Sequence, residues 1–451
     1  MQLKKSVDEL KDSVKAALTV DAGGKATITD EKKLCFEAID ILAYNAAINK
    51  DKAVAAEAKR IIRAAAKAFG SPSASIQGLY EAMGRGDCKD FTVPAINIRG
   101  LTYDTSRAVF RAAKKNDSTT VLFEIAKSEI SYTDQRPEEY AACVLAAAIK
   151  EGYKAPVFIQ GDHFQINAKK YGEDKKAEID GLKKLIAEAL EAEFYNIDID
   201  ASTIVDLSKP SVTEQQRPNF ENTAELTAFI RNKEKEKGLS VVSIGGEIGE
   251  VGGKNSTEEE LRAFMDGYKA ALDKKFIGIS KISVQTGTSH GGVVLPDGSI
   301  AKVKVDFDTI EKLSRVSREV YGLSGVVQHG ASTLPDDAFH IFREKAAAEV
   351  HLATGFQNLT YDSASFPKAL KEEIYEHLRK VHSDEKKAGE TDEQFIYKTR
   401  KKGFGPFKEK MWMLPRPTID AIGKELEDRF DLIFKKLNAV NTSAHVKKYV
   451  K

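Results

Sequence analysis

Eight short apolar runs, each followed by a helical stretch, constrain the fold of this chain more than any other feature. The runs are rich in β-branched residues and are broken by Gly, Ser or Asp, which is typical of buried strands. They lie at residues 93–98, 119–125, 155–160, 193–199, 239–245, 281–287, 324–330 and 348–354. Because eight strands alternate with helices over roughly 270 residues, the sequence predicts an α/β fold, the (β/α)8 or TIM barrel.

An open doubly wound sheet is the alternative arrangement of such units. It would require a glycine fingerprint after an early strand, and the first run ends in NIRG without one. Residues 1–74 carry apolar positions at helical spacing, so we expect an N-terminal helical extension there. The barrel should then occupy 75–451, with an insertion loop at about 382–410 and a final amphipathic helix.

Composition narrows the possible partners. The net charge is only +1, which favours neither nucleic acid nor an anionic membrane as a partner. The three cysteines lie far apart without CxxC spacing, which fits a reducing cytoplasm and argues against disulfides or a Cys-ligated metal. The first residues, MQLKKSVDELKDSVK, lack an apolar core, and no run approaches the ~20 residues of a membrane span. We therefore expect neither a signal peptide nor a membrane segment.

Three of the eight histidines, His163, His290 and His329, stand at the ends of separate strand-like runs. A lone histidine in such a place is usually a hydrogen-bonded structural residue. Three imidazoles at one end of a barrel suit a single divalent metal with an open fourth position, as a catalytic zinc site requires. Asp162 stands beside the first histidine, and a metal with an adjacent carboxylate favours proton abstraction.

The loops after the seventh and eighth runs are small and bear hydroxyl groups. They are HGAST (329–333) and HLATG (351–355). Loops at these places of a barrel commonly bind a phosphate through backbone N–H groups. Ser332 and Thr354 can donate hydroxyls there, and Gly330 lets the backbone approach closely; Gly291, after the sixth run, can do the same. These loops therefore predict a phosphorylated small-molecule substrate.

Together these segments resemble the class II, zinc-dependent fructose-bisphosphate aldolases. The similarity runs in order from residue 75 to about 440, and any single motif in it is short. The motifs are PAIN (94–97), GDH (161–163), IDAS (199–202), GEIGEVGG (246–253), GTSHGG (287–292), DFDTIEKL (306–313), HGAST and HLATG.

The resemblance implies an enzyme of glycolysis and gluconeogenesis that reversibly cleaves fructose 1,6-bisphosphate to dihydroxyacetone phosphate and glyceraldehyde 3-phosphate. Zn²⁺ would be held by the three histidines, and Asp162 would be the general acid/base. Glu247 and Asp200 match positions that orient ligands or hold a second cation, divalent or monovalent. The resemblance also implies a homodimer or higher homo-oligomer. The implied substrate-binding residues are Asn97, Gly291, Gly330, Ala331, Ser332, His351, Ala353, Thr354 and Lys410.

Several residues keep a simpler interpretation open. Asp200 could cap the following helix, Glu247 could be only a hydrogen-bond partner, and Asn97 could form a turn. The sequence also departs from the family pattern. His351 stands where the family usually has Asn, Ala126 where it has Ser, and Lys254 and Asn255 where it has acidic residues. A zinc aldolase for another ketose phosphate, such as tagatose 1,6-bisphosphate, and a non-catalytic aldolase-like subunit therefore remain alternatives.

The basic segment YKTRKKGFGPFKEK lies just before the only tryptophan, Trp412. A solvated surface loop is its simplest interpretation. The functional hypothesis is that Lys398, Arg400, Lys401 and Lys410 recognise the phosphate farthest from the zinc. The family has Arg at the position of Lys410, and Lys binds phosphate as a point charge without the bidentate fork of Arg.

Overall fold

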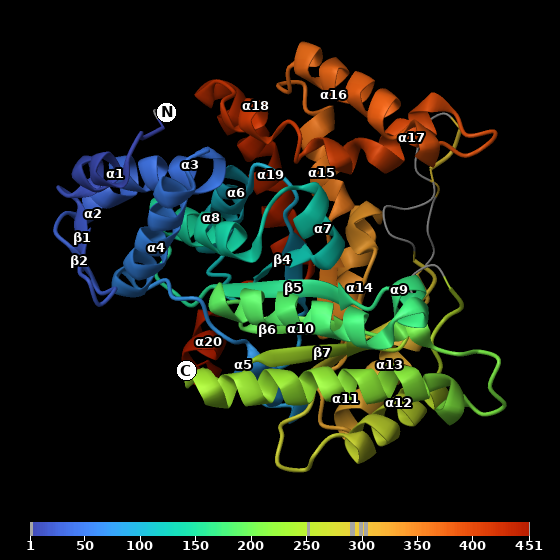
Figure 1. The fold of residues 1–451 in the computed structure, drawn as a ribbon. Helices are drawn as coiled ribbons and strands as arrows, with labels where there is room; N and C mark the ends of the chain where they lie inside the picture. The colour runs from blue at the N-terminus through green and yellow to red at the C-terminus, as the bar shows by residue number, and fades with distance from the viewer. Residues whose placement is uncertain (1–2, 250–252, 289–293, 297–300, 302–304, 451) are drawn as a thin grey trace.

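The computed structural model describes residues 3–249, 253–288, 294–296, 301 and 305–450. Eight parallel strands close into a barrel in the order β10-β3-β4-β5-β6-β7-β8-β9, which confirms the predicted (β/α)8 fold (Figure 1). Each strand overlaps one of the eight predicted runs. The strands are β3 (Val93–Asn97), β4 (Leu122–Ala126), β5 (Phe158–Gln165), β6 (Asn196–Asp200), β7 (Ser243–Glu247), β8 (Lys281–Val284), β9 (Val326–Gln328) and β10 (Glu349–Leu352).

Amphipathic helices surround the barrel and bury their apolar faces against the strands (Figure 1). They are α6 (Thr102–Lys115), α8 (Pro137–Lys150), α10 (Lys175–Glu191), α11 (Val212–Lys237), α12 (Glu258–Ala271), α13 (Phe307–Glu319), α14 (Phe339–Glu344) and α19 (Arg416–Lys436). Shorter helices follow several strands: α7 (Lys127–Tyr132), α9 (Ala168–Glu173), η2 (Ser202–Ile204), η3 (Ala331–Thr333), η4 (Asp336–Ala338) and α15 (Thr354–Asp362). Two more, α5 (Gln77–Gly84) and α20 (Ser443–Tyr449), pack on each other next to the amino ends of the strands.

The barrel interior contains charged groups near the amino ends of the strands. The ammonium of Lys281 donates to Gln160 at 2.8 Å, to Asp198 at 3.0 Å and to Glu349 at 2.6 Å. The hydroxyl of Tyr80 on α5 donates to the same Glu349. Lys281 is only 1% exposed, and a buried ammonium is tolerated only when carboxylates compensate its charge. Through Glu349, this cluster contacts His351 at the bottom of a pocket at the carboxyl ends of the strands.

The N-terminal segment packs on the outer face of α8, where Lys150 pairs with Asp40 and Arg63 pairs with Glu138. Figure 1 shows it in blue on one side of the barrel. Its elements are α1 (Val7–Val14), β1 (Leu18–Val20), β2 (Ala26–Ile28), α2 (Glu31–Lys33), η1 (Leu34–Ala38), α3 (Ile39–Ile48) and α4 (Lys52–Phe69). The expectation of helices alone missed the β1–β2 hairpin, because each strand has three residues and too few alternating positions to show a period of two.

The segment expected as a loop at 382–410 is largely helical. It follows α16 (Lys368–Val381) and contains η5 (Ser383–Glu385), α17 (Asp392–Thr399), η6 (Arg400–Gly403) and the start of α18 (Lys408–Trp412). A capping box of Thr391 and Gln394 starts α17, which buries Phe395 and Ile396. The polar composition of the segment concealed these few apolar positions.

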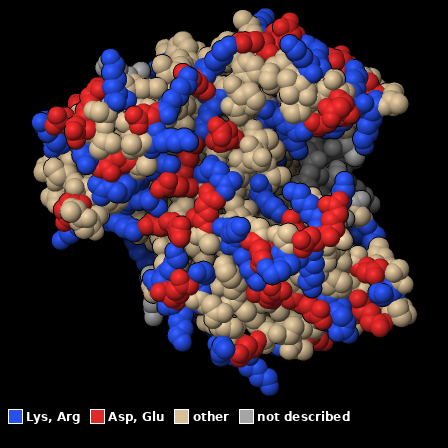
Figure 2. Space-filling view, viewed as in Figure 1, with Lys and Arg blue, Asp and Glu red and all other residues tan. Residues whose placement is uncertain are grey.

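On the face shown in Figure 2, Lys and Arg side chains are interspersed with Asp and Glu. This mixture agrees with the small net charge of the chain. Among the described residues, no helix is both long and apolar enough to cross a bilayer.

Candidate active site

A pocket of about 540 Å³ opens at the carboxyl ends of the barrel strands. Its walls carry side chains that follow β3, β4, β5, β7, β9 and β10, as expected for a site on this face of the fold. The sequence-predicted residues that line it are Asn97, Asp162, His163, Glu247, His329, Gly330, Ser332, His351, Ala353, Thr354 and Lys401.

A bulge in β5 brings two consecutive residues, Asp162 and His163, into this pocket. Successive strand residues normally face opposite sides, but the pairing of β5 with β6 shifts register between Gly161 and Phe164. His163 has φ of 41°, in the left-handed region that non-glycine residues rarely adopt. A side chain at position 161 would lie 2.6 Å from the Phe164 ring, so glycine is required there. The strained backbone serves to place an imidazole beside a carboxylate.

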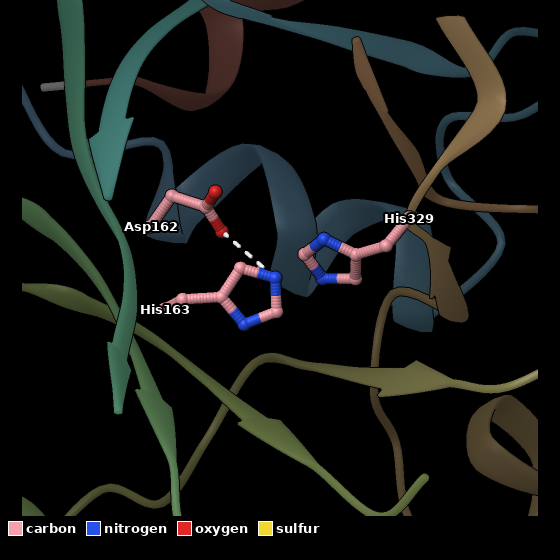
Figure 3. A group of neighbouring side chains, drawn as sticks. All are labelled: Asp162, His163 and His329. Atoms are coloured by element: carbon pink, nitrogen blue, oxygen red, sulfur yellow. Dashed lines mark ion pairs between the residues drawn. The ribbon is translucent and has the colours of Figure 1, made fainter. Parts of the chain in front are cut away.

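His329, directly after β9, reaches toward this pair from the other side of the pocket. Figure 3 shows Asp162, His163 and His329 converging, and the two imidazole centroids are 4.3 Å apart. The Nε2 atom of His329 lies 3.1 Å from the hydroxyl of Ser283 on β8. One ligand atom from each of the three converging residues lies within 4.8 Å of the others.

Carboxylates on β6 and β7 orient the His163 ring. Its Nδ1 atom lies 3.0 Å from Asp200 and 3.3 Å from Glu247, which leaves Nε2 on the side of Asp162, 4.0 Å away. A carboxylate behind a histidine in this way fixes the ring for metal ligation. Burial raises the pKa of Glu247 to about 8, and the nearby Asp200 adds to that shift. Asp200 also accepts from the backbone N–H and the hydroxyl of Ser202, the first residue of η2.

His351 and Glu124 form a second polar group at the bottom of the pocket. The Nδ1 atom of His351 lies 3.0 Å from Glu124 and 3.3 Å from Asp162, and its Nε2 atom lies 2.5 Å from Glu349. Burial opposes charge on this ring, but the surrounding carboxylates outweigh it and hold the pKa of His351 well above its usual range. Burial, with a further contribution from Asp162, raises the pKa of Glu124 to about 7.

The donor set fits a divalent cation. Imidazole nitrogens and carboxylate oxygens are the ligands that such a site requires, and Asp162, His163 and His329 offer both kinds. The Oδ1 atom of Asp162 is buried and accepts no hydrogen bond from the residues that the structure describes. A second group, His163 with Asp200 and Glu247, also meets the spacing for a metal.

Four other residues predicted for the site are His290, Gly291, Ala331 and Lys410. His290 and Gly291 fall outside the described residues. Ala331 is fully buried in η3 and does not line the pocket. Lys410 points away from the pocket, with a side chain that is 57% exposed and paired with Glu373. The expected role of Lys410 therefore has no geometric support.

Sequence reasoning missed one cationic residue of the pocket, Arg99. Arg99, two residues after Asn97, donates to Glu129 at 2.7 Å and to Gln357 at 2.9 Å. Its position in NIRG directly after a strand was the available signal. Lys401 was expected only as part of a basic cluster, yet among that cluster it alone lines the pocket. Burial, together with Arg99, lowers the pKa of Lys401.

The remaining members of the basic cluster are occupied by acidic partners. Lys398 binds Glu390 at 2.9 Å, and Arg400 binds Asp362 at 2.9 Å. Lys401 forms no ion pair with the described carboxylates and lies over the ring of Tyr132.

A closed parallel barrel with imidazoles and carboxylates at the carboxyl ends of its strands defines a site of the kind used by metal-dependent barrel enzymes. A family model described as fructose-bisphosphate aldolase class-II matches residues 79–423. The chain therefore belongs to the class II fructose-bisphosphate aldolase family, whose members are typically metal-dependent.

Comparisons with solved structures show the same fold at low sequence identity. The fructuronate-tagaturonate epimerase UxaE from Cohnella laeviribosi is 10% identical, with a TM-score of 0.57 over 84% of this chain and 86% of that one. A fructose-bisphosphate aldolase from Campylobacter jejuni is 18% identical, with a TM-score of 0.50 over 82% and 97%. A probable tagatose 6 phosphate kinase from Sinorhizobium meliloti is 18% identical in sequence. Its TM-score is 0.50, over 79% of this chain and 93% of that one. The comparison with curated proteins finds no match.

Proposed function

We propose that this protein is a zinc-dependent aldolase that reversibly cleaves fructose 1,6-bisphosphate to dihydroxyacetone phosphate and glyceraldehyde 3-phosphate. The convergence of Asp162, His163 and His329 within 4.8 Å, at the carboxyl end of a barrel of this family, is the observation that carries the proposal. His290 would complete the metal ligands. When bound, the metal would act as a Lewis acid toward the ketone oxygen and so favour the enediolate.

Asp162 is the group placed to move the proton. In the cleavage direction its carboxylate takes the proton of the C4 hydroxyl, the C3–C4 bond breaks, and the bonding electrons remain on the ketone half as the enediolate. Protonation of that half at C3 then gives dihydroxyacetone phosphate. Burial would raise the pKa of Asp162, but His163 and His351 hold it well below its usual range. The group is therefore ionised, as a base must be.

The loops after β9 and β10 are suited to the phosphate of the ketone half. Gly330 has φ of 71°, which turns the backbone into η3. The hydroxyl of Ser332 accepts from the N–H of Gly355, so the two loops are joined. The helix α15 begins at Thr354, and helix N-termini favour anions. Arg99 lies at the same place, 3.3 Å from the hydroxyl of Thr354.

A panel of ketose phosphates tests the proposal. The purified protein, after its metal content is measured, should cleave fructose 1,6-bisphosphate in preference to tagatose 1,6-bisphosphate and fructose 1-phosphate. A protein that contains the metal but turns over no ketose phosphate and exchanges no dihydroxyacetone phosphate α-proton would be a non-catalytic relative.

Tagatose 1,6-bisphosphate is the second candidate. It differs from fructose 1,6-bisphosphate in the configuration of one hydroxyl, and the bottom of the pocket departs from the family pattern at His351. Preference for this sugar in the same panel would change the substrate while leaving the roles of Asp162 and the histidines intact.

Lys401 is expected to bind the phosphate farther from the metal. Lys401→Ala should raise KM for the bisphosphate by more than tenfold, since a charge-assisted bond contributes ~1.5–3 kcal/mol. The side chain lines the pocket and has no competing ion pair among the described residues. Steady-state kinetics would measure the change, with the exposed Lys410→Ala as the matched control that keeps a normal KM.

The α-proton exchange of dihydroxyacetone phosphate separates the two phosphates, because this half-reaction needs only the near one. Exchange should survive in Lys401→Ala. If exchange and cleavage fell together, Lys401 would belong to the near phosphate instead.

A further inference from the structure

Besides Oδ1 of Asp162 and the hydroxyl of Tyr132, two buried oxygen atoms on adjacent strands of the pocket have no hydrogen-bond partner among the described residues. They are Oε1 of Glu124 and Oδ1 of Asn97. Both side chains line the pocket, although Glu124 is 0% exposed and Asn97 only 2%. Their Cα atoms are register partners on β4 and β3, so the two side chains lie side by side on the inner surface. Because unpaired buried polar atoms are costly, this pair indicates a ligand that supplies the missing partner.

The rest of each side chain is held by the protein. The other oxygen of Glu124, Oε2, accepts from Gln160 at 3.0 Å and faces His351. The Nδ2 atom of Asn97 donates to a carboxylate oxygen of Glu129 at 2.6 Å, which fixes the amide with its oxygen toward the unpaired side. The orientation of both groups is therefore set before any ligand binds.

A hydroxyl group is the partner that matches both atoms. A phosphate would be repelled by the carboxylate, and an ammonium would suit only the ionised form of Glu124. A hydroxyl donates to a carboxylate and accepts from a protonated carboxyl, so it pairs with Glu124 in either state. The amide oxygen of Asn97 needs a donor, and the same hydroxyl supplies it while it accepts from a protonated Glu124.

We propose that Glu124, with Asn97 beside it, binds the hydroxyl next to the carbonyl carbon of the aldehyde half and so restricts the enzyme to hydroxyaldehyde substrates. This inference rests on the proposed aldolase function. The ketone half is assigned to the loops after β9 and β10. Glu124 stands on β4, two strands beyond β10, so the hydroxyl that reaches it belongs to the other half. Glu124 then acts as a specificity-determining residue, while Asp162 carries the proton transfer.

Aldol synthesis from dihydroxyacetone phosphate and two aldehydes tests this role. The aldehydes are D-glyceraldehyde 3-phosphate and 3-phosphopropanal, which lacks only the 2-hydroxyl. The wild-type protein should favour the hydroxylated aldehyde in kcat/KM by at least ~10²-fold, because a site built to bind a hydroxyl rejects the analogue without it. Glu124→Ala should reduce that ratio at least tenfold. Glu124→Gln should keep it within about threefold, because an amide also pairs with a hydroxyl.

The controls separate specificity from folding and from chemistry. Ser131→Ala, at the exposed rim of the same pocket, should leave the ratio unchanged. All variants should retain bound metal and the α-proton exchange of dihydroxyacetone phosphate. An unchanged ratio in Glu124→Ala, or equal losses with both aldehydes, would overturn the inference. A wild-type enzyme that is active without preference would overturn it too and leave the aldolase function standing. A wild-type protein with neither synthesis nor exchange would overturn both.

Discussion

Removal of the metal should abolish aldol cleavage, and added Zn²⁺ or Co²⁺ should restore it. The reason is that Asp162, His163 and His329 offer closely spaced ligand atoms for a divalent cation, and that cation would supply the Lewis acid. Loss of a Lewis acid that contributes several kcal/mol should slow turnover by ~10³-fold or more. His163→Ala and His329→Ala should have the same effect as chelation. Activity assays paired with metal analysis before and after EDTA would measure it.

A histidine far from the pocket supplies the matched control. His340→Ala, on the outer helix α14, should keep both metal and activity, since its side chain is 41% exposed and faces Glu344. Full turnover in a metal-free sample would contradict the assignment of these histidines as ligands.

Replacement of Asp162 should stop carbon–carbon cleavage while the protein still binds dihydroxyacetone phosphate. Asp162→Asn keeps the shape of the side chain but removes the base, so carbon–carbon cleavage should fall by at least ~10²-fold. Binding of dihydroxyacetone phosphate should change little, because its phosphate loops belong to other strands. Single-turnover kinetics and a binding measurement on the same variant would show the contrast.

Two controls show whether the loss of activity in Asp162→Asn comes from the missing carboxylate. Metal content should be normal in Asp162→Asn, and Asp206→Asn, in the loop after η2, should behave as the wild-type protein. Near-normal turnover in Asp162→Asn would show that another group moves the proton, and Glu124 would be a candidate because it shares the contact with His351.

The barrel could be predicted because its signal is local and repeated. Each strand run is short, apolar and bounded by turn residues, and eight repeats leave few other architectures. The hairpin of β1 and β2 had no such repetition, and α17 contributes only a few apolar residues within a polar segment. Such short patterns do not reveal a strand or a helix when the composition of the surrounding segment favours another structure.

Site residues could be predicted from the sequence only where their position next to a strand-like run gave them away. Asp162, His163 and His329 directly follow or lie near the end of apolar runs, which the sequence displays directly. The pairing of Glu124 with His351 depends on which side chains face each other across the barrel interior, and no local pattern shows it. The same limit separates Lys401 from Lys410, because the path of the chain through η6 and α18 decides which cation meets the pocket.

The bulge in β5 also has a consequence for how such a site can change. It holds the proposed base and a proposed metal ligand at adjacent positions on one strand, so their spacing does not depend on the rest of the pocket wall. The residues that we propose to contact the distant parts of the substrate come from β3, β4 and η6, and they can be exchanged without disturbing that spacing. New substrates should therefore be easiest to obtain by changing Glu124 or Lys401, with the residues of the bulge and His351 left untouched.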